Sequence, residues 1–157
     1  MEKEGDRMVI SVEDASVREL DRLYEIEKEC FDAEMFTRQQ LLQFLSNYNS
    51  IGLVAKENGE IVGFIIGTLR VERNLASGHV LTIDVLPSSR RRGIGRKLLE
   101  ELERVFKGKG VRFCYLEVRE GNSVAISLYE KAGYQRLGRL ERYYGDVHGL
   151  RFRKMLS

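Results

Sequence analysis

The apolar positions of this chain follow a helical period in some segments and a strand period in others. Residues 16–19 and 37–40 each carry a capping-box pattern, and apolar residues at helical spacing follow both. Two more amphipathic helices are predicted after residue 93 and after Asn122, and glycines end both of them. The pattern therefore predicts four helices.

Apolar runs typical of strands separate these helices. Asn58-Gly59 lies between two such runs, which indicates a hairpin because both central residues of its turn need a positive φ. A third long strand ends at Pro87, and the run at 111–118 is almost entirely apolar, which predicts a strand buried on both faces. The element order indicates a mixed α/β domain on one sheet, with a meander first and a closing hairpin last. Strands are expected at residues 8–12, 51–57, 61–71, 79–86, 111–118, 134–144 and 150–156.

Composition narrows the class of protein. The 157 residues suit one domain, 1–157, in which residues 1–7 are expected to be flexible. With 43% hydrophobic and 32% charged residues the chain is not disordered, and no apolar run could span a bilayer. No signal-peptide pattern precedes the first strand, so a cytoplasmic location is expected. The net charge of +2 is too small to argue for a direct nucleic-acid role.

Cysteine and histidine usage argues against a metal site. Cys30 and Cys114 lie far apart and match no metal or redox spacing, and the chain has only two histidines. Two reduced, packed thiols are expected.

The stretch RRRGIGRK, residues 90–97, lies between a predicted strand and a predicted helix, where first-turn amides and the helix dipole favour an anion. A Walker loop does not fit, because Gly93 and Gly95 are too close together and Lys97 is followed by leucine. A dinucleotide fingerprint lacks its third glycine and a parallel βαβ start. The pattern R-x-x-G-x-G fits from Arg90 onward, and the alternative is a solvated basic start of a helix.

This pattern resembles the pyrophosphate-binding turn of the GNAT family of acetyl-CoA-dependent N-acetyltransferases. The segments GHVLTIDVLPSSRRRGIG, LEVREGNSVAISLYEKAGY and ERYYGD are similar to further parts of that family, most of all to ribosomal-protein alanine and archaeal protein N-terminal acetyltransferases. The resemblance spans Gly78 to the C-terminus. It implies a central, mostly antiparallel sheet with a parallel pair splayed at the cofactor site, flanked by about four helices. It also implies acetyl-CoA as co-substrate, with no metal.

The resemblance further implies which residues hold coenzyme A. The backbone of the strand before the turn would pair with the pantetheine arm, and the turn itself would hold the pyrophosphate. Asn122 would cap a helix and also bond the pantetheine amides, and Lys131 would approach the phosphates. The expected cofactor-binding residues are Ile83, Asp84, Val85, Arg90, Arg91, Arg92, Gly93, Ile94, Gly95, Arg96, Asn122, Tyr129 and Lys131.

Three residues are expected to take part in proton transfer. Glu117 is a carboxylate in an otherwise apolar strand, where burial would raise its pKa, and the family places its general base there. Tyr129 lies on the inner stripe of a helix and corresponds to the family's general acid, while core packing is the alternative for it. His79 would relay the proton or is an ordinary surface histidine.

The acceptor is expected to be the α-amine of a protein or peptide N-terminus, bound between the first helix–helix loop and the last hairpin. The expected substrate-binding residues are Phe31, Asp32, Glu34, Tyr143 and Tyr144. The loop lacks a proline that some relatives carry, so the preferred first residue stays open. The alternatives are a small-molecule amine or lysine acetyltransferase, and a non-catalytic module that binds acetyl-CoA or docks on the ribosome. A monomer or weak homodimer without a membrane role is expected, and ribosome association stays open.

Overall fold

The computed structural model describes residues 9–31 and 35–156. Within these residues, seven strands form one sheet in the order β1-β2-β3-β4-β5-β7-β6, and only β4 and β5 are parallel neighbours. Four α-helices accompany the sheet, so the expected mixed α/β architecture is confirmed. The elements are β1 (Ile10–Asp14), η2 (Val17–Glu19), α1 (Leu20–Cys30), α2 (Arg38–Ser46), β2 (Ser50–Glu57), β3 (Glu60–Glu72), β4 (Leu75–Val85), η3 (Pro87–Ser89), α3 (Ile94–Gly108), β5 (Phe113–Arg119), α4 (Ser123–Lys131), β6 (Gln135–Tyr144) and β7 (Val147–Met155).

Local signals in the sequence account for most element boundaries. The Thr37 hydroxyl accepts from the Gln40 amide at 3.1 Å, and the Gln40 side chain accepts from the Thr37 amide at 2.8 Å, which completes the predicted capping box of α2. Asn58 and Gly59 have φ values of 52° and 87°, as the predicted β2–β3 turn requires. Asn122 accepts from the Ala125 amide and caps α4.

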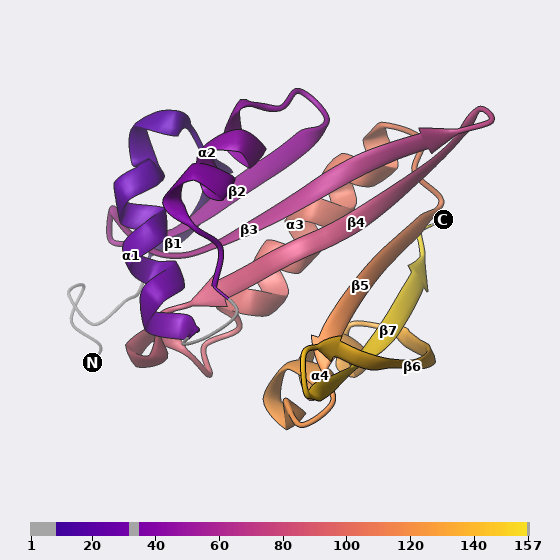
Figure 1. Ribbon diagram of the computed structural model, residues 1–157. Helices are drawn as coiled ribbons and strands as arrows, with labels where there is room; N and C mark the ends of the chain where they lie inside the picture. Colours follow the sequence, from indigo (N-terminus) through magenta and orange to yellow (C-terminus); the bar gives the residue numbers. More distant parts are fainter. Residues whose placement is uncertain (1–8, 32–34, 157) are drawn as a thin grey trace, which may run out of the picture.

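The sheet is covered on both faces. Helices α1 and α2 lie over one face of β2, β3 and β4, and α3 lies over the other (Figure 1). The core on the α1 and α2 side is built around Leu23, Phe64 and Ile66, and the core on the α3 and α4 side is larger. The strands β5, β6 and β7 extend beyond the cover of α1 and α2 (Figure 1).

The parallel pair opens along its length. Strands β4 and β5 pair only from Ser77 opposite Phe113 to His79 opposite Tyr115, and further along they separate (Figure 1). A β-bulge lies where the pairing of β3 with β4 skips Leu81. The expected splay of the parallel pair is therefore confirmed, and we call the separation of the β4 and β5 backbones beyond His79 the opening.

The prediction that β5 is buried on both faces is wrong. Cys114, Leu116 and Val118 are buried against the α3 side, whereas the alternate residues, among them Tyr115 and Glu117, are only partly covered. The cause is that α1 and α2 stop short of β5 on that face. The polar face of β5 therefore borders the opening between the two parallel strands.

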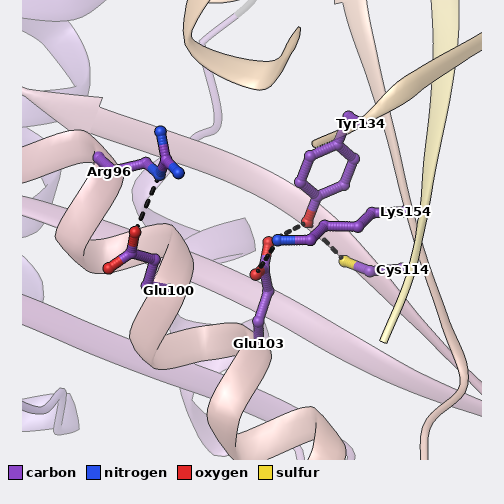
Figure 2. Close-up of polar contacts among 6 residues, drawn as sticks. All are labelled: Arg96, Glu100, Glu103, Cys114, Tyr134 and Lys154. Atoms are coloured by element: carbon purple, nitrogen blue, oxygen red, sulfur yellow. Dashed lines mark hydrogen bonds and ion pairs between the residues drawn. The ribbon is translucent and has the colours of Figure 1, made fainter. Parts of the chain in front are cut away.

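A buried polar network fastens α3 to the second half of the sheet (Figure 2). The Tyr134 hydroxyl lies 2.8 Å from Glu103 Oε2 and 3.2 Å from Cys114 Sγ, and Lys154 Nζ lies 2.7 Å from Glu103 Oε1. Burial raises the pKa of the Cys114 thiol to about 12, so it stays protonated. Both cysteines are free, as expected. The network holds the helix whose N-terminus follows the glycine–arginine turn.

Candidate active site

The turn before α3 presents free backbone amides. Gly93 has a φ of 78°, a left-handed conformation that favours glycine, and its carbonyl accepts from the Lys97 amide at 3.0 Å. The amides of Ile94 and the next two residues therefore have no partner inside the helix. A Cβ on Gly95 would lie 3.4 Å from Leu128 Cδ2 and 3.8 Å from Val85 Cγ2. The first turn of α3 therefore lies close to α4 and to the end of β4, and its free amides could hold an anion there.

The arginines of this turn contribute less free charge than expected. The Arg90 Nε donates to the Val85 carbonyl at 2.9 Å, Arg92 forms an ion pair with Glu57, and Arg96 pairs with Glu100 at 2.9 Å (Figure 2). Among the contacts of the described residues, none involves the Arg91 side chain, which is exposed. The expectation that all these side chains supply charge is corrected, because three of them already have protein partners. The backbone amides and Arg91 remain for an anion.

The end of β4 borders the same opening. Ile83 and Val85 pack toward α3, whereas the Asp84 side chain is buried on the opposite face. The Val85 carbonyl accepts from both Arg90 and the Cys30 thiol, the latter at 3.4 Å. A carbonyl has two lone pairs, so the Val85 carbonyl is not available to a ligand, contrary to the expected backbone pairing at that atom. Ile83 and the Val85 amide keep that possibility, whereas the Asp84 backbone faces Phe64 in the pairing with β3.

Glu117 lies at the opening, where its carboxylate contacts one histidine and one arginine side chain. Its Oε1 lies 2.6 Å from His79 Nε2 and its Oε2 accepts from Arg151 Nε at 3.1 Å, while only 8% of the side chain is exposed. Burial would raise the pKa of Glu117, but the His79 and Arg151 contacts outweigh burial and lower the pKa instead. The expected raised pKa is therefore wrong. Glu117 is a stable carboxylate that orients the half-exposed His79.

The tyrosine pair of the last hairpin reaches this group. Tyr143 and Tyr144 lie at the end of β6 with ring centroids 4.9 Å apart. Burial and the neighbouring Glu117 raise the pKa of Tyr143, which therefore lies next to that carboxylate. Tyr144 is close enough to Tyr129 to influence its pKa. The hairpin thus borders Glu117 and Tyr129, two of the three residues that were expected to be catalytic.

The Tyr129 side chain is buried near Tyr144 and the end of β4. It is 6% exposed and its ring packs on Tyr134 with centroids 6.1 Å apart. In the described part of the chain its hydroxyl makes no hydrogen bond. Burial, with smaller effects of Tyr144 and Asp84, raises the pKa of Tyr129, so its proton is retained at neutral pH.

The remaining expected residues lie on α4, at the end of α1 or outside the described residues. Asn122 uses Oδ1 as a helix cap and keeps its amide group exposed. Lys131 is exposed and lines a shallow hollow of about 590 Å³ on α4 together with Glu120 and Glu130. Phe31 follows α1 and is half-buried. Two predicted acceptor residues, Asp32 and Glu34, lie outside the described residues.

Arg151 is the site residue that sequence reasoning missed. It lies opposite Glu117 in the register of β5 and β7, and 34 positions separate the two in the sequence. Only the cross-strand register reveals this proximity, and one sequence does not supply that register. Among residues 9–31 and 35–156, no group of three or more His, Cys, Asp or Glu side chains could hold a metal ion. No helix in those residues is long and apolar enough to cross a membrane.

Known proteins are similar to this chain in sequence and in fold. A model of the acetyltransferase (GNAT) family matches residues 20–134. The N-alpha-acetyltransferase of Sulfurisphaera tokodaii is 31% identical over 147 residues, covering 86% of this chain and 86% of that relative. The catalytic subunit NAA20 of the Arabidopsis thaliana N-terminal acetyltransferase B complex is 35% identical, covering 79% and 73%. The crystal structure of the ribosomal-protein-S18-alanine N-acetyltransferase from Escherichia coli has the same fold, with a TM-score of 0.82, 24% identity and 95% of each chain covered.

Proposed function

The chain belongs to the acetyltransferase (GNAT) family and is an acetyl-CoA-dependent N-acetyltransferase, and we propose that it acetylates the α-amino group at a protein or peptide N-terminus. The observation that carries the proposal is the Glu117–His79 pair at the opening between β4 and β5, with Tyr143 of the last hairpin beside it. The names of the relatives, N-alpha-acetyltransferase and N-terminal acetyltransferase catalytic subunit, support the same acceptor.

Acetyl-CoA would lie along the opening between the parallel strands. Its pyrophosphate would accept from the free amides of residues 94–96 and from Arg91, where the helix dipole adds positive potential. Its pantetheine arm would run along the edge of β4 near Ile83, with the Asn122 amide and Lys131 on the α4 side. A backbone amide of β4 would then donate to the thioester oxygen and stabilise the charge that develops there.

His79 and Glu117 would remove the proton from the acceptor. The Nε2 of His79 faces Glu117, which leaves Nδ1 for the amine, directly or through water. A peptide α-amine has a pKa of about 8, so a modest base is sufficient. The amine lone pair attacks the thioester carbon and the C–N bond forms. The amine proton passes to His79, whose positive charge the Glu117 carboxylate stabilises.

Tyr129 would complete the transfer. The C–S bond breaks and the electron pair leaves on the sulfur of coenzyme A. The protonated Tyr129 hydroxyl would donate to that thiolate, because its burial keeps the proton on the oxygen and it has no other hydrogen-bond partner among the described residues. Tyr144 beside it would help exclude water.

The acceptor chain would enter between the segment that follows α1 and the β6–β7 hairpin. Phe31 on one side and Tyr143 and Tyr144 on the other offer apolar and hydroxyl groups to a peptide backbone. Asp32 and Glu34 stay predictions for the attraction of the cationic terminus.

A peptide panel tests this acceptor. Peptides that differ at the first two residues are incubated with acetyl-CoA and the protein, and the products are identified by mass. We expect one acetyl group on the free α-amine of a subset, and none on the same peptides when the terminus is blocked and an internal lysine is free. Acetylation of free small amines or of internal lysines alone would overturn the α-amine assignment.

Removal of Arg151 is expected to shift the pH dependence of catalysis. Arg151 stabilises the Glu117 carboxylate and lowers its pKa, so Arg151→Met raises that pKa toward its ordinary value. Without the arginine the coupled Glu117–His79 pair binds a proton more readily, so the acid limb that belongs to this pair moves to higher pH. The ratio of variant to wild-type kcat/KM, which cancels the titration of the peptide amine, should therefore fall toward acid pH and change little at alkaline pH. The measurement is a pH–rate profile of both proteins, with Arg153→Met, two positions along β7, as the matched control. An unmoved acid limb would show that Arg151 does not act on the base.

A further inference from the structure

Two carboxyl groups inside the protein each have one oxygen without a partner. Glu27 on α1 and Asp84 on β4 are both only 1% exposed. Among the described residues, Glu27 Oε1 and Asp84 Oδ2 are buried and accept no hydrogen bond. An isolated buried carboxylate is unfavourable by several kcal/mol. Two such oxygens in one region therefore need a physical explanation.

The other oxygen of each carboxyl group is satisfied. The Thr82 hydroxyl donates to Asp84 Oδ1 at 2.7 Å, and the Phe36 amide donates to Glu27 Oε2 at 2.8 Å. Helix α1, which carries Glu27, packs on β4, and the Cys30 thiol of α1 donates to the carbonyl of Val85, the residue after Asp84. The Glu27 side chain is close enough to raise the pKa of Asp84. Two ionised carboxylates only accept, so a contact between them becomes a hydrogen bond only when one of them carries a proton. One proton between them would satisfy both orphan oxygens.

We propose that Glu27 and Asp84 share one proton, and that this protonated bridge positions Phe36 against the donor strand β4. The inference rests on the proposed peptide acceptor, because Phe36 belongs to the segment between α1 and α2 that would border the acceptor. Both members are positioning residues, since neither faces the opening between β4 and β5.

The bridge connects the two sides of the reaction. On one side, Asp84 is the second-last residue of β4. Its neighbours Ile83 and Val85 border the opening where the cofactor would lie. On the other side, Glu27 holds the amide of Phe36, the residue directly before the N-cap of α2. The Phe36 ring packs edge-on against Phe44 of α2 with centroids 5.1 Å apart. Loss of the bridge would release this end of the acceptor segment from the strand that holds the donor.

The surroundings favour a bridge that carries one proton and a single negative charge. The charged or titratable groups that act on Asp84 or on its neighbours are Cys30 of α1, Arg90 after β4 and Tyr129 of α4. Burial raises the pKa of Cys30 to about 11, so this thiol stays neutral. The strand β3 presents Phe64 directly opposite Asp84. Arg90 is the only cation in this set, and its Nε already donates to the Val85 carbonyl.

The sign of the pH effect follows from Asp84. Burial first, and Glu27 second, raise the pKa of Asp84 well above its ordinary value, against the smaller opposing effects of Thr82 and Arg90. The folded protein therefore holds a proton that the unfolded chain releases near a pH of about 4. This contribution to stability is complete below that pH and is lost as the pH rises through the folded-state pKa of Asp84. As the pH rises through the same range, the bridge is lost and Phe36 is held less firmly.

Conservative variants test the bridge through the acceptor KM. Glu27→Gln can still accept from the Phe36 amide, and its own amide can donate to Asp84 without any titration. Asp84→Asn likewise keeps a donor that does not titrate, whereas Asp84→Ala removes the bridge. Peptide KM and kcat are measured for each protein from slightly acid to alkaline pH. Ratios of variant to wild type are compared at each pH, because they cancel the titration of the peptide amine.

We expect the wild-type peptide KM to rise relative to that of Glu27→Gln by up to about tenfold per pH unit once the shared proton is lost. Asp84→Asn should behave like Glu27→Gln, and Asp84→Ala should have a raised peptide KM at every pH, with a much smaller effect on kcat. Glu103→Gln alters another buried glutamate, in the Tyr134 network, and should keep the wild-type pH dependence of KM. KM ratios that do not vary with pH would overturn the positioning role.

Thermal unfolding separates this inference from the proposed function. Relative to wild type, Glu27→Gln and Asp84→Asn should gain stability as the pH rises, and Glu103→Gln should not gain in this way. If no peptide is acetylated, the proposed acceptor fails, and these melting curves still decide whether the proton is shared. If peptides are acetylated but the melting curves of both conservative variants run parallel to wild type, the shared proton is refuted. Should Asp84→Ala fail to fold, the two conservative variants carry the test.

Discussion

Replacement of Glu117 by glutamine is expected to lower kcat by roughly 100- to 10,000-fold, the usual range for the loss of a positioned acid–base group. Glutamine has the size of glutamate and can still hydrogen bond to His79. It cannot stabilise the positive charge that His79 acquires with the amine proton. The measurement is the initial rate with the best peptide of the panel, together with the affinity for acetyl-CoA by calorimetry. Because the change is confined to proton transfer, the acetyl-CoA affinity should be retained.

Glu120→Gln is the matched control for this variant. Glu120 follows directly after β5 and forms an exposed ion pair with Arg139, away from His79. It should keep the wild-type rate. Full activity of Glu117→Gln with intact cofactor binding would mean that Glu117 is not needed for proton removal. Equal losses in both variants would point to a general effect of charge on this edge of the sheet.

Charge reversal at the turn before α3 is expected to weaken acetyl-CoA binding by about 100-fold or more, which corresponds to the loss of two charge-assisted hydrogen bonds. The variant combines Arg91→Glu with Gly95→Glu. The first change removes the arginine that has no protein partner, and the second brings a carboxylate to the free first-turn amides. Both repel a pyrophosphate. A Cβ at Gly95 meets Leu128 at ordinary contact distance, so the fold should persist.

Arg104→Glu on the same helix is the control for charge. The Arg104 side chain is 77% exposed and lies more than two turns from the turn. Calorimetry at two salt concentrations should give a wild-type affinity for this control and a much weaker one for the double variant. Circular dichroism should show cooperative melting for both. An unchanged affinity of the double variant would refute the role of the turn as the pyrophosphate site.

Local signals were sufficient for many parts of the fold, including the glycine turn before α3. The capping box at Thr37, the positive φ of Gly59 and Gly93, and the N-cap Asn122 each depend on atoms within a few residues of one another. Such interactions are encoded in short stretches of sequence. The pairing of Glu117 with His79 was also anticipated in outline, because both polar residues lie in neighbouring apolar strands.

Other features could not be predicted because they depend on distant partners. The pKa of Glu117 is lowered, not raised, since Arg151 and His79 stand 34 and 38 positions away along the chain. Arg92, in the turn before α3, forms an ion pair with Glu57, the last residue of β2. The open face of β5 follows from where α1 and α2 end. In each case, the sequence did not show which distant group would lie beside the residue.

The sequence by itself determined the order and type of the elements, the glycine turn before α3 and the polar residues of the second half. Tertiary structure decided which of those groups are free, which are paired and in which direction Glu117 and Asp84 titrate. The physical reason is that turns and caps depend on dihedral angles and hydrogen bonds between near neighbours. Desolvation and Coulomb energies depend on distances in space, and here strand register and helix packing bring Arg151 to Glu117 and Glu27 to Asp84.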